Sequence, residues 1–239
     1  MRREFSRDGA EITIIERSDR HIYQPGFVTL LFDLDKPENL IRATKDLFLD
    51  GINLIIDEVT SIDQGRNKVT TAKYGDIFYD YLVIATGAKL YLDEPEAMKE
   101  GLEKGENMGE EVIQNSEGIG DALGWVPCHK SSLIHRSFNN IYVIGDAGNF
   151  PSAKTASGAR IQAKVLAQRI KAHIRGEVPK ATYDGHTICP IMTRYGRAMF
   201  AEFNYTKSIS PARESYIRWL IHVHVIRRLY WNLMLKGLF

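Results

Sequence analysis

The sequence has little cysteine, almost no net charge and no long apolar run, and each of these absences excludes a class of protein. The chain contains only two cysteines, Cys128 and Cys189, which are too few for a scaffold built on disulfides. A net charge of +1 over 239 residues supplies no field for nucleic acid, so we expect no nucleic-acid partner. No run of about 18 uninterrupted apolar residues exists, which excludes a conventional membrane-spanning helix.

We also expect no secretory signal, because Met1 is followed by charged residues rather than by an apolar segment. With 44% hydrophobic and 26% charged residues, the composition is that of an ordinary globular protein. The length allows one large domain or two small ones. Short apolar runs and helical patterns predict an α/β protein.

A further absence concerns the glycine turn of dinucleotide-binding proteins. Residues 11–15 predict a strand that ends at Glu16. In a dinucleotide-binding unit such an acidic residue follows a GxGxxG turn by about 20 residues. No GxGxxG precedes Glu16, so we interpret the chain as beginning partway through a Rossmann unit. Residues 1–10 are predicted to be the last turns of a helix that stops at Gly9.

Residues 141–170 form the most informative stretch. Residues 141–144 predict a strand buried on both faces, which Gly145 and Asp146 end, and a helix is predicted to begin near Ser152. Strand, glycine turn, acidic residue and helix N-terminus are the order in which α/β proteins bind phosphorylated or flavin-type ligands. A plain turn between strand and helix is the alternative, and the pattern alone leaves both open.

Other elements follow from local patterns. We predict a helix over residues 38–50, strands over 52–56, 58–63, 81–85 and 198–203, and a hairpin joining 68–71 to 76–79. Between residues 93 and 111 the composition becomes acidic, which is typical of a solvated linker or surface helix.

The C-terminal segment from Lys207 is basic and rich in aromatic residues. Trp219, Val223, Ile226 and Tyr230 recur at helical spacing, with further apolar bulk around them. This pattern favours an amphipathic helix on a membrane surface, because the apolar surface is too broad for one face. A helix packed on the domain is the alternative.

We expect no metal site. Cys128, His129 and His135 would supply three groups without a fourth, and His222 and His224 lie two apart on a helix, where they point in different directions.

Several stretches together resemble one family. They are residues 12–16 with His21-Ile22-Tyr23-Gln24-Pro25, the apolar run 81–87 ending in Ala-Thr-Gly, the Gly145-Asp146 turn with residues 151–155, the segment from Tyr183-Asp184-Gly185 to Cys189-Pro190, and Tyr230-Trp231-Asn232. Taken together, they resemble the sulfide:quinone oxidoreductases, a branch of the flavoproteins with two dinucleotide-binding domains.

The resemblance implies an α/β fold: an incomplete FAD-binding Rossmann-like domain with a C-terminal helical segment that associates with a membrane. Its predicted parts are residues 1–92, a partial FAD-binding domain; 93–114, an acidic linker in place of the second dinucleotide domain; 115–180, the FAD-binding domain continued; and 181–239, with a redox cysteine and the amphipathic tail. The first strand, its GxGxxG turn and most of the second dinucleotide domain are expected to be missing.

The resemblance also implies roles for individual residues. Glu16 is expected at the FAD ribose, Val59 beside the adenine, and Asp146 at the ribityl hydroxyls, with Lys154 adding positive charge near the flavin. The predicted cofactor-binding residues are Glu16, Val59, Ala85, Thr86, Gly87, Gly145, Asp146, Lys154 and Thr155. For Lys154 alone, a solvated lysine is the alternative.

Cys189 is the predicted catalytic residue, because a thiolate beside a flavin can exchange with a disulfide or a persulfide. A buried structural cysteine is the alternative. The family's second redox cysteine has no match here, and Cys128 lies outside any matching motif. Ile188, Tyr230 and Trp231 are predicted to line a quinone site.

The resulting expectation is an FAD-dependent enzyme that passes electrons from sulfide to quinone at a membrane surface, on the cytoplasmic face. A type II NADH:quinone dehydrogenase and an inactive flavoprotein remnant are the alternatives. The sequence indicates nothing about oligomeric state.

Overall fold

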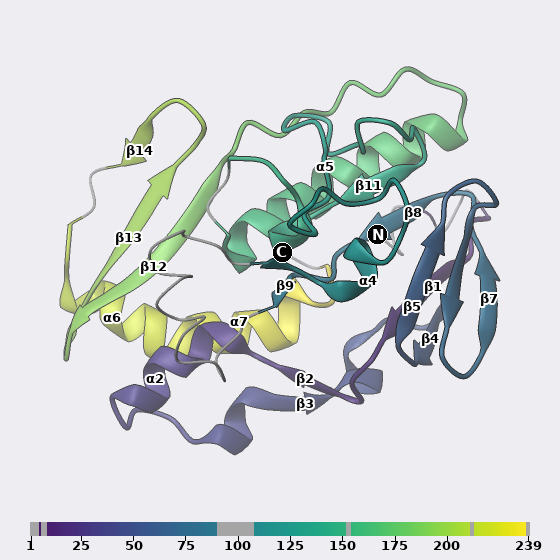
Figure 1. The fold of residues 1–239 in the computed structure, drawn as a ribbon. Helices are drawn as coiled ribbons and strands as arrows, with labels where there is room; N and C mark the ends of the chain where they lie inside the picture. The colour runs from purple at the N-terminus through teal and green to yellow at the C-terminus, as the bar shows by residue number, and fades with distance from the viewer. Residues whose placement is uncertain (1–4, 6–8, 90–107, 152–153, 211–212, 238–239) are drawn as a thin grey trace. The chain divides into compact units, whose positions relative to one another are not determined.

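A computed structural model of the chain describes residues 5, 9–89, 108–151, 154–210 and 213–237 (Figure 1). The chain divides into two compact units, each treated separately below. The first unit contains Met1–Asp57, Lys171–Val178 and His186–Phe239, and the second contains Glu58–Ile170 and Pro179–Gly185. The helix predicted within residues 1–10 lies largely outside the described residues.

The first unit contains a parallel strand pair. Strand β1 (Ile12–Glu16) pairs in parallel with β4 (Ile52–Ile56), and Glu16 is the last residue of its strand, opposite Ile56. Both strands alternate exposed and partly buried residues at their start and then become continuously half-buried. The two predicted strands in this region are therefore confirmed.

The predicted helix over residues 38–50 is wrong. That segment forms the 3₁₀ turns η2 (Pro37–Leu40) and η3 (Thr44–Leu47) on either side of strand β3 (Ile41–Ala43). Strand β3 pairs antiparallel with β2 (Arg20–Ile22), placing Ile41 opposite Ile22. Pairing with a distant strand thus overrides the helical spacing of the apolar residues. Between β2 and η2, the chain forms the 3₁₀ turn η1 (Gln24–Gly26) and the short helix α2 (Phe27–Leu31).

A three-stranded antiparallel sheet and the C-terminal helix complete the first unit (Figure 1). The sheet order is β12 (Thr187–Arg194), β13 (Arg197–Phe203) and β14 (Ser208–Ser210). The helix runs without interruption through α6 (Tyr216–Leu220), η5 (Ile221–Ile226), α7 (Arg227–Leu229) and η6 (Tyr230–Met234), of which η5 and η6 are π-helical. The hydroxyl of Ser215 caps its start by accepting a hydrogen bond from the Arg218 backbone N–H.

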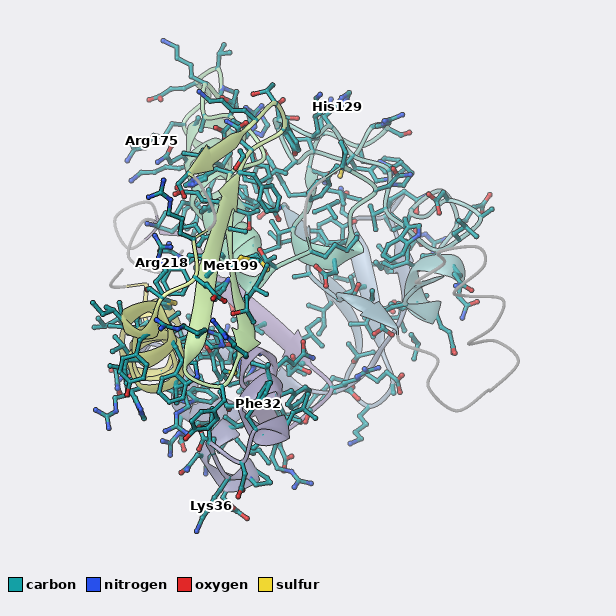
Figure 2. The ribbon with its side chains drawn as sticks, turned by 90° about the vertical axis from the view of Figure 1, so that its left-hand side faces the viewer. Phe32, Lys36, His129, Arg175, Met199 and Arg218 are labelled. Carbon is teal, nitrogen blue, oxygen red and sulfur yellow. The ribbon has the colours of Figure 1, made fainter. Side chains whose placement is uncertain are left out.

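The C-terminal helix packs on its own unit along one face. Trp219 and Val223 are buried with Ala198, and Trp231 is buried with Tyr23 in a separate cluster. Other apolar side chains stay exposed, among them Ile217 (69%) and Val225 (41%) on the helix and Leu31 (83%) on α2. Phe32, just after α2, is 38% exposed (Figure 2). Among the described residues, no helix is long and apolar enough to cross a membrane.

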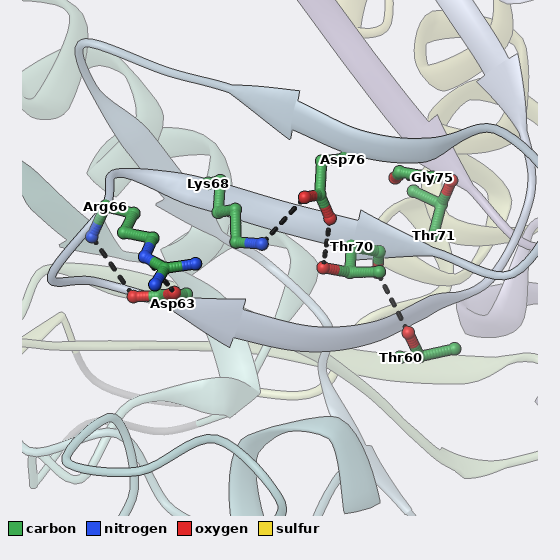
Figure 3. Close-up of polar contacts among 8 residues, drawn as sticks. All are labelled: Thr60, Asp63, Arg66, Lys68, Thr70, Thr71, Gly75 and Asp76. Carbon is green, nitrogen blue, oxygen red and sulfur yellow. Dashed lines mark hydrogen bonds and ion pairs between the residues drawn. The ribbon is translucent and has the colours of Figure 1, made fainter.

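The second unit begins with a meander of β5 (Val59–Asp63), β6 (Lys68–Thr71) and β7 (Gly75–Phe78). The predicted hairpin between β6 and β7 is confirmed, and Gly75 adopts a φ of +73° at its turn. The carboxylate of Asp76 accepts hydrogen bonds from Lys68 Nζ and Thr70 Oγ1, each over 2.7 Å (Figure 3).

The core of the second unit surrounds two parallel strands. Strand β8 (Leu82–Ile84) pairs with β11 (Ile141–Val143), and all three residues of β11 are buried, as predicted for a strand covered on both faces. Helix α5 (Ala156–Ile174) follows β11 and begins at Ala156 rather than near Ser152. Before it, β9 (Ala88–Lys89) pairs with β10 (Met108–Gly109), and helix α4 (Glu111–Gln114) buries Ile113.

Candidate functional site

The turn after β11 is the best-defined part of the candidate site. Gly145, Asp146 and Ala147 form a 3₁₀ turn, η4 (Gly145–Ala147), in which Gly145 adopts a φ of +65°. That left-handed conformation favours glycine over residues with a Cβ. The Gly145 N–H donates a 2.7 Å hydrogen bond to Oε1 of Gln162, a residue of α5 that is almost completely buried. The helix therefore holds the turn in place.

Asp146 is half-buried in this turn. Within the described part of the chain, no side chain or N–H group donates a hydrogen bond to its carboxylate. A half-buried carboxylate without donors is able to accept hydrogen bonds from the hydroxyls of a bound ligand.

Lys154 reaches back to the same turn. Its ammonium donates to the backbone oxygens of Asp146 (2.7 Å) and Gly148 (3.3 Å) and lies 4.2 Å from the centroid of the Trp125 ring. Desolvation of the ammonium lowers the pKa of Lys154, an effect that the Asp146 carboxylate opposes. Lys154 thus makes specific contacts with the turn, and its role in cofactor binding stays a prediction.

Trp125 belongs to a loop that braces the turn from outside. Asp121 accepts hydrogen bonds from the backbone of Trp125 (3.0 Å) and from the side chain of Asn149 (2.8 Å). The N–H of Val126 donates to the carbonyl of Ala147 over 2.9 Å. The loop before β11 and the turn after it are therefore fixed together.

Thr155 caps helix α5. Its hydroxyl accepts a 3.0 Å hydrogen bond from the Gly158 N–H, and its carbonyl accepts one from the Ala159 N–H. The N-terminus of this 19-residue helix is thus close in sequence to the η4 turn and carries a partial positive charge that favours anionic groups. A role for Thr155 in cofactor binding remains a prediction.

The remaining predicted residues of the second unit lie on β5 and after β8. Ala85 and Thr86 are exposed, and Gly87 adopts a φ of +81° with open space where a Cβ would stand. Val59 opens β5 and is half-buried. The backbone after β8 is therefore accessible to a ligand.

In the first unit, Glu16 sits at the end of β1, where the sequence places it. Its Oε1 accepts a 3.2 Å hydrogen bond from the Ser18 N–H, and its backbone oxygen accepts one from Asp57. Its second carboxylate oxygen receives no hydrogen bond within the described part of the chain.

Cys189 lies on β12, an edge strand of its three-stranded sheet, opposite Ala201 of β13. Its thiol is free and half-buried. Because side chains alternate along a strand, Cys189 and its neighbour Ile188 face opposite sides of the sheet. Pro190 suits the same edge strand, since it has no N–H to donate to a ladder.

Cys128 differs from Cys189. It is 1% exposed in the second unit, and burial raises the pKa of its thiol to about 12. A thiol in that state is a poor nucleophile. Nearby, buried His135 uses both ring nitrogens, one toward the Ile119 carbonyl and one as acceptor for the Ser137 N–H.

Tyr230 and Trp231, predicted for the quinone, lie in a cluster with two residues that the sequence did not single out as functional. We call His21, Tyr23, Tyr230 and Trp231 the aromatic cluster. The rings of Tyr23 and Tyr230 are 4.6 Å apart, and those of Tyr230 and Trp231 are 5.1 Å apart. Arg42 lies 5.7 Å from the Trp231 ring.

The predicted residues thus fall into two groups. Glu16, Ile188, Cys189, Tyr230 and Trp231 belong to the first unit; Val59, Ala85, Thr86, Gly87, Gly145, Asp146, Lys154 and Thr155 belong to the second. His21 and Tyr23 were missed as site residues because their partner Tyr230 is 209 positions away from His21. The titratable ring of His21 beside a Gln-Pro turn was the only local signal.

Comparison with known proteins finds sequence relatives, whereas no family model matches. The chain is 34% identical to the mitochondrial sulfide:quinone oxidoreductase of Mus musculus and 35% identical to that of Dictyostelium discoideum. Each alignment covers 53% of this chain and 29% of the relative, so the matched region spans less than a third of those proteins. A type II NADH:quinone oxidoreductase of Staphylococcus epidermidis is 30% identical over 36% of the chain and 22% of the relative.

Solved structures share the fold. The sulfide:quinone oxidoreductase of Aquifex aeolicus matches with a TM-score of 0.82 at 15% identity, over 97% of this chain and 87% of that one. A chain from the mitochondrial ATP synthase of Tetrahymena thermophila gives a TM-score of 0.80 at 13% identity, over 97% and 91%. The chain therefore has an α/β fold like that of the Aquifex aeolicus protein and resembles mitochondrial sulfide:quinone oxidoreductases in sequence over about half its length.

Proposed function

We propose that this protein is an FAD-dependent oxidoreductase that passes electrons from sulfide to a quinone. The observation that carries the proposal is the Asp146 turn, which follows a buried parallel strand. Its half-buried carboxylate accepts no hydrogen bond from the residues that the structure describes. The sequence relatives named sulfide:quinone oxidoreductase support the choice of substrates.

The residues of the Asp146 turn fit the flavin end of FAD. The Asp146 carboxylate would accept hydrogen bonds from ribityl hydroxyls, and the exposed backbone after β8 would approach the cofactor closely. The capped N-terminus of α5 would favour negative charge on the reduced flavin. Glu16 would accept a hydrogen bond from the adenosine ribose, with Val59 beside the adenine.

Bound FAD supplies two-electron redox chemistry. The thiolate of Cys189 would bond to the sulfur of sulfide as an S–H bond of sulfide breaks, which releases a proton and two electrons, and FAD would be the acceptor of those electrons. Cys189 can play this part because its thiol is partly accessible, whereas the buried Cys128 cannot.

A visible spectrum of the purified protein tests the cofactor. We expect a flavin absorption band, either as purified or after incubation with FAD. A protein that stays colourless would refute the flavoenzyme proposal and would favour the alternative of an inactive flavoprotein remnant. Sulfide should then bleach the band in the wild type and in Cys128→Ser, but not in Cys189→Ser. Bleaching that persists in Cys189→Ser would refute its role.

The second candidate is an NADH:quinone oxidoreductase, which the Staphylococcus epidermidis relative favours. NADH in place of sulfide separates the two functions in the same spectroscopic assay. We expect sulfide and not NADH to bleach the flavin; the reverse result would favour the second candidate.

The same proposal includes a membrane surface at the C-terminal helix. Exposed Ile217 and Val225 would insert at the lipid interface, with the basic Arg218 and Arg228 nearby. Flotation with anionic phospholipid vesicles should weaken in Ile217→Glu and Val225→Glu. The control, Val178→Glu, changes an 81% exposed valine away from this helix; equal flotation of all the variants would exclude the helix as the anchor.

A further inference from the structure

His21 and Tyr230 form a close pair across the first unit. His21 Nε2 lies 2.5 Å from the hydroxyl oxygen of Tyr230, and the two rings stack with centroids 5.9 Å apart at 17°. His21 is the middle residue of strand β2, and Tyr230 lies near the end of the C-terminal helix, 209 positions later. The contact is therefore built by the tertiary fold.

The direction of the hydrogen bond follows from the two titratable groups. Burial, together with neighbouring Tyr23, raises the pKa of Tyr230 to about 12, so its phenol keeps the proton at neutral pH. Burial lowers the pKa of His21, and the Glu16 carboxylate partly offsets this shift. At neutral pH the phenol of Tyr230 thus donates to Nε2, and the neutral imidazole carries its own hydrogen on Nδ1.

The surroundings of the pair are aromatic and apolar. Tyr23 (4% exposed) and Trp231 (8% exposed) belong to one buried core cluster, and Tyr230 packs against it. The charged groups that act on the cluster are Glu16 toward His21, Arg227 toward Tyr23, and Arg42 over the Trp231 ring. Tyr230 thus packs against the apolar cluster, whereas the imidazole of His21 is partly exposed to solvent.

We propose that His21 and Tyr230 carry a proton to the quinone that is reduced at the aromatic cluster. The proposal rests on the proposed function, because it gives the residues that serve the second half of that reaction. A phenol in contact with a quinone oxygen can donate its proton as a general acid. The histidine hydrogen-bonded to that phenol can then return a proton to the phenolate.

The step balances as follows. Quinone takes up two electrons, which derive from the two-electron oxidation of sulfide, and two protons. One proton comes from Tyr230, whose O–H bond breaks as an O–H bond forms on the quinol. Neutral His21 then takes up a proton from solvent at Nε2, and this Nε2–H bond breaks as the O–H bond of the phenol forms again. The second proton balances the one released when the persulfide forms on Cys189.

The test separates the two half-reactions in the holoenzyme. In Tyr230→Phe and His21→Gln, we expect bleaching by sulfide at the wild-type rate but reoxidation by a water-soluble quinone about 100-fold slower. The wild-type reoxidation rate should fall as pH rises through the pKa of His21, and His21→Gln should lose this dependence. Imidazole added to His21→Ala should restore part of the rate. Tyr216→Phe and His224→Gln, on the exposed side of the same helix, should behave as wild type.

A second readout does not require turnover. In nitrogen-15 NMR of the histidine rings, we expect His21 to show an Nε2 that accepts a strong hydrogen bond, and Tyr230→Phe should remove that signature. Wild-type reoxidation in both variants, or an Nε2 shift unchanged by Tyr230→Phe, would overturn the proposal while leaving the flavoenzyme intact. A colourless protein would instead overturn the proposed function and this role together.

Discussion

The backbone amide of Gly145 and the side chain of Gln162 form a 2.7 Å hydrogen bond that ties the turn after β11 to helix α5. The glutamine is 2% exposed, so its amide is committed to this contact rather than to solvent. The polar side chain of Gln162 is thus buried between helix α5 and the turn, where it binds the backbone of a glycine in the left-handed conformation. The contact fixes the backbone of the residue that directly precedes Asp146.

Replacing Gln162 with leucine should destabilise the second unit. The Gly145 N–H would lose its acceptor inside the protein, a loss that costs about 1–3 kcal/mol for a buried group. Urea unfolding measures this change. The control, Gln168→Leu, changes an exposed glutamine of the same helix and should shift the unfolding free energy by less than about 0.5 kcal/mol. Equal effects of the two substitutions would contradict the assigned role of Gln162.

How far the sequence predicts this structure depends on the range of the contacts. Local apolar runs predict strands such as β4 and β11, and the glycine at position 75 predicts the turn before β7. The segment after Pro37 was misread as a helix, because its strand forms only by pairing with β2. The Gly145–Asp146 turn could be predicted, since a strand, a glycine and a helix follow one another within a few residues.

Long-range contacts in the candidate site could not be predicted in the same way. His21 meets Tyr230, and Asp35 meets Arg227 across 192 positions, through folding alone. Residue type shows that such groups need partners, but it does not say which partners they find. The contact between the Lys154 ammonium and the Trp125 ring also forms only in the folded chain, so the sequence did not predict it.

Arg227 forms an ion pair with Asp35, whose side chain is only 7% exposed. Burial alone would raise the pKa of Asp35, but hydrogen bonds from Asn39, Lys36 and Arg227 outweigh it and lower the pKa. Arg227→Met should therefore leave a poorly hydrated carboxylate without its cation and destabilise the first unit by about 1–3 kcal/mol.

Arg228→Met is the matched control for Arg227→Met, since Arg228 is the next residue of the helix and is exposed. Urea unfolding at pH 7 should leave Arg228→Met close to wild type. At pH values below the ordinary pKa of aspartate the difference between wild type and Arg227→Met should shrink, because the lowered pKa of Asp35 stabilises the fold only while the carboxylate is charged. A constant difference down to pH 3 would contradict the ion-pair explanation.

The thiols should differ in reactivity. Cys189 is half-buried on an edge strand, whereas burial raises the pKa of Cys128 to about 12. We expect iodoacetamide at pH 8 to label Cys189 at least about tenfold faster than Cys128 in the folded protein. Peptide mass spectrometry measures the two rates. In urea both should react at similar rates, and a faster Cys128 in the folded state would refute the difference in burial.

We expect His222 to make the stability of the first unit depend on pH. It is 7% exposed, and its ring nitrogens have no hydrogen-bond partner within the described part of the chain. Burial lowers its pKa, so protonation in the unfolded chain begins near 6.5 while the folded protein still holds the neutral ring. The free energy of unfolding should thus fall as pH drops below about 6.5, toward the lowered pKa of the folded state. Asp35 and Arg227 line the same pocket.

His222→Phe should remove this part of the pH dependence. The unfolding free energy, measured in urea at pH 7.5 and pH 5.5, should then change less with pH than in the wild type. Some dependence should persist, because burial also lowers the pKa of His21 and of His135. His224→Phe, an exposed position two residues away, should keep the full wild-type dependence. If both variants lost the same amount, burial of His222 would not be the cause, since only one of the two rings is shielded from solvent.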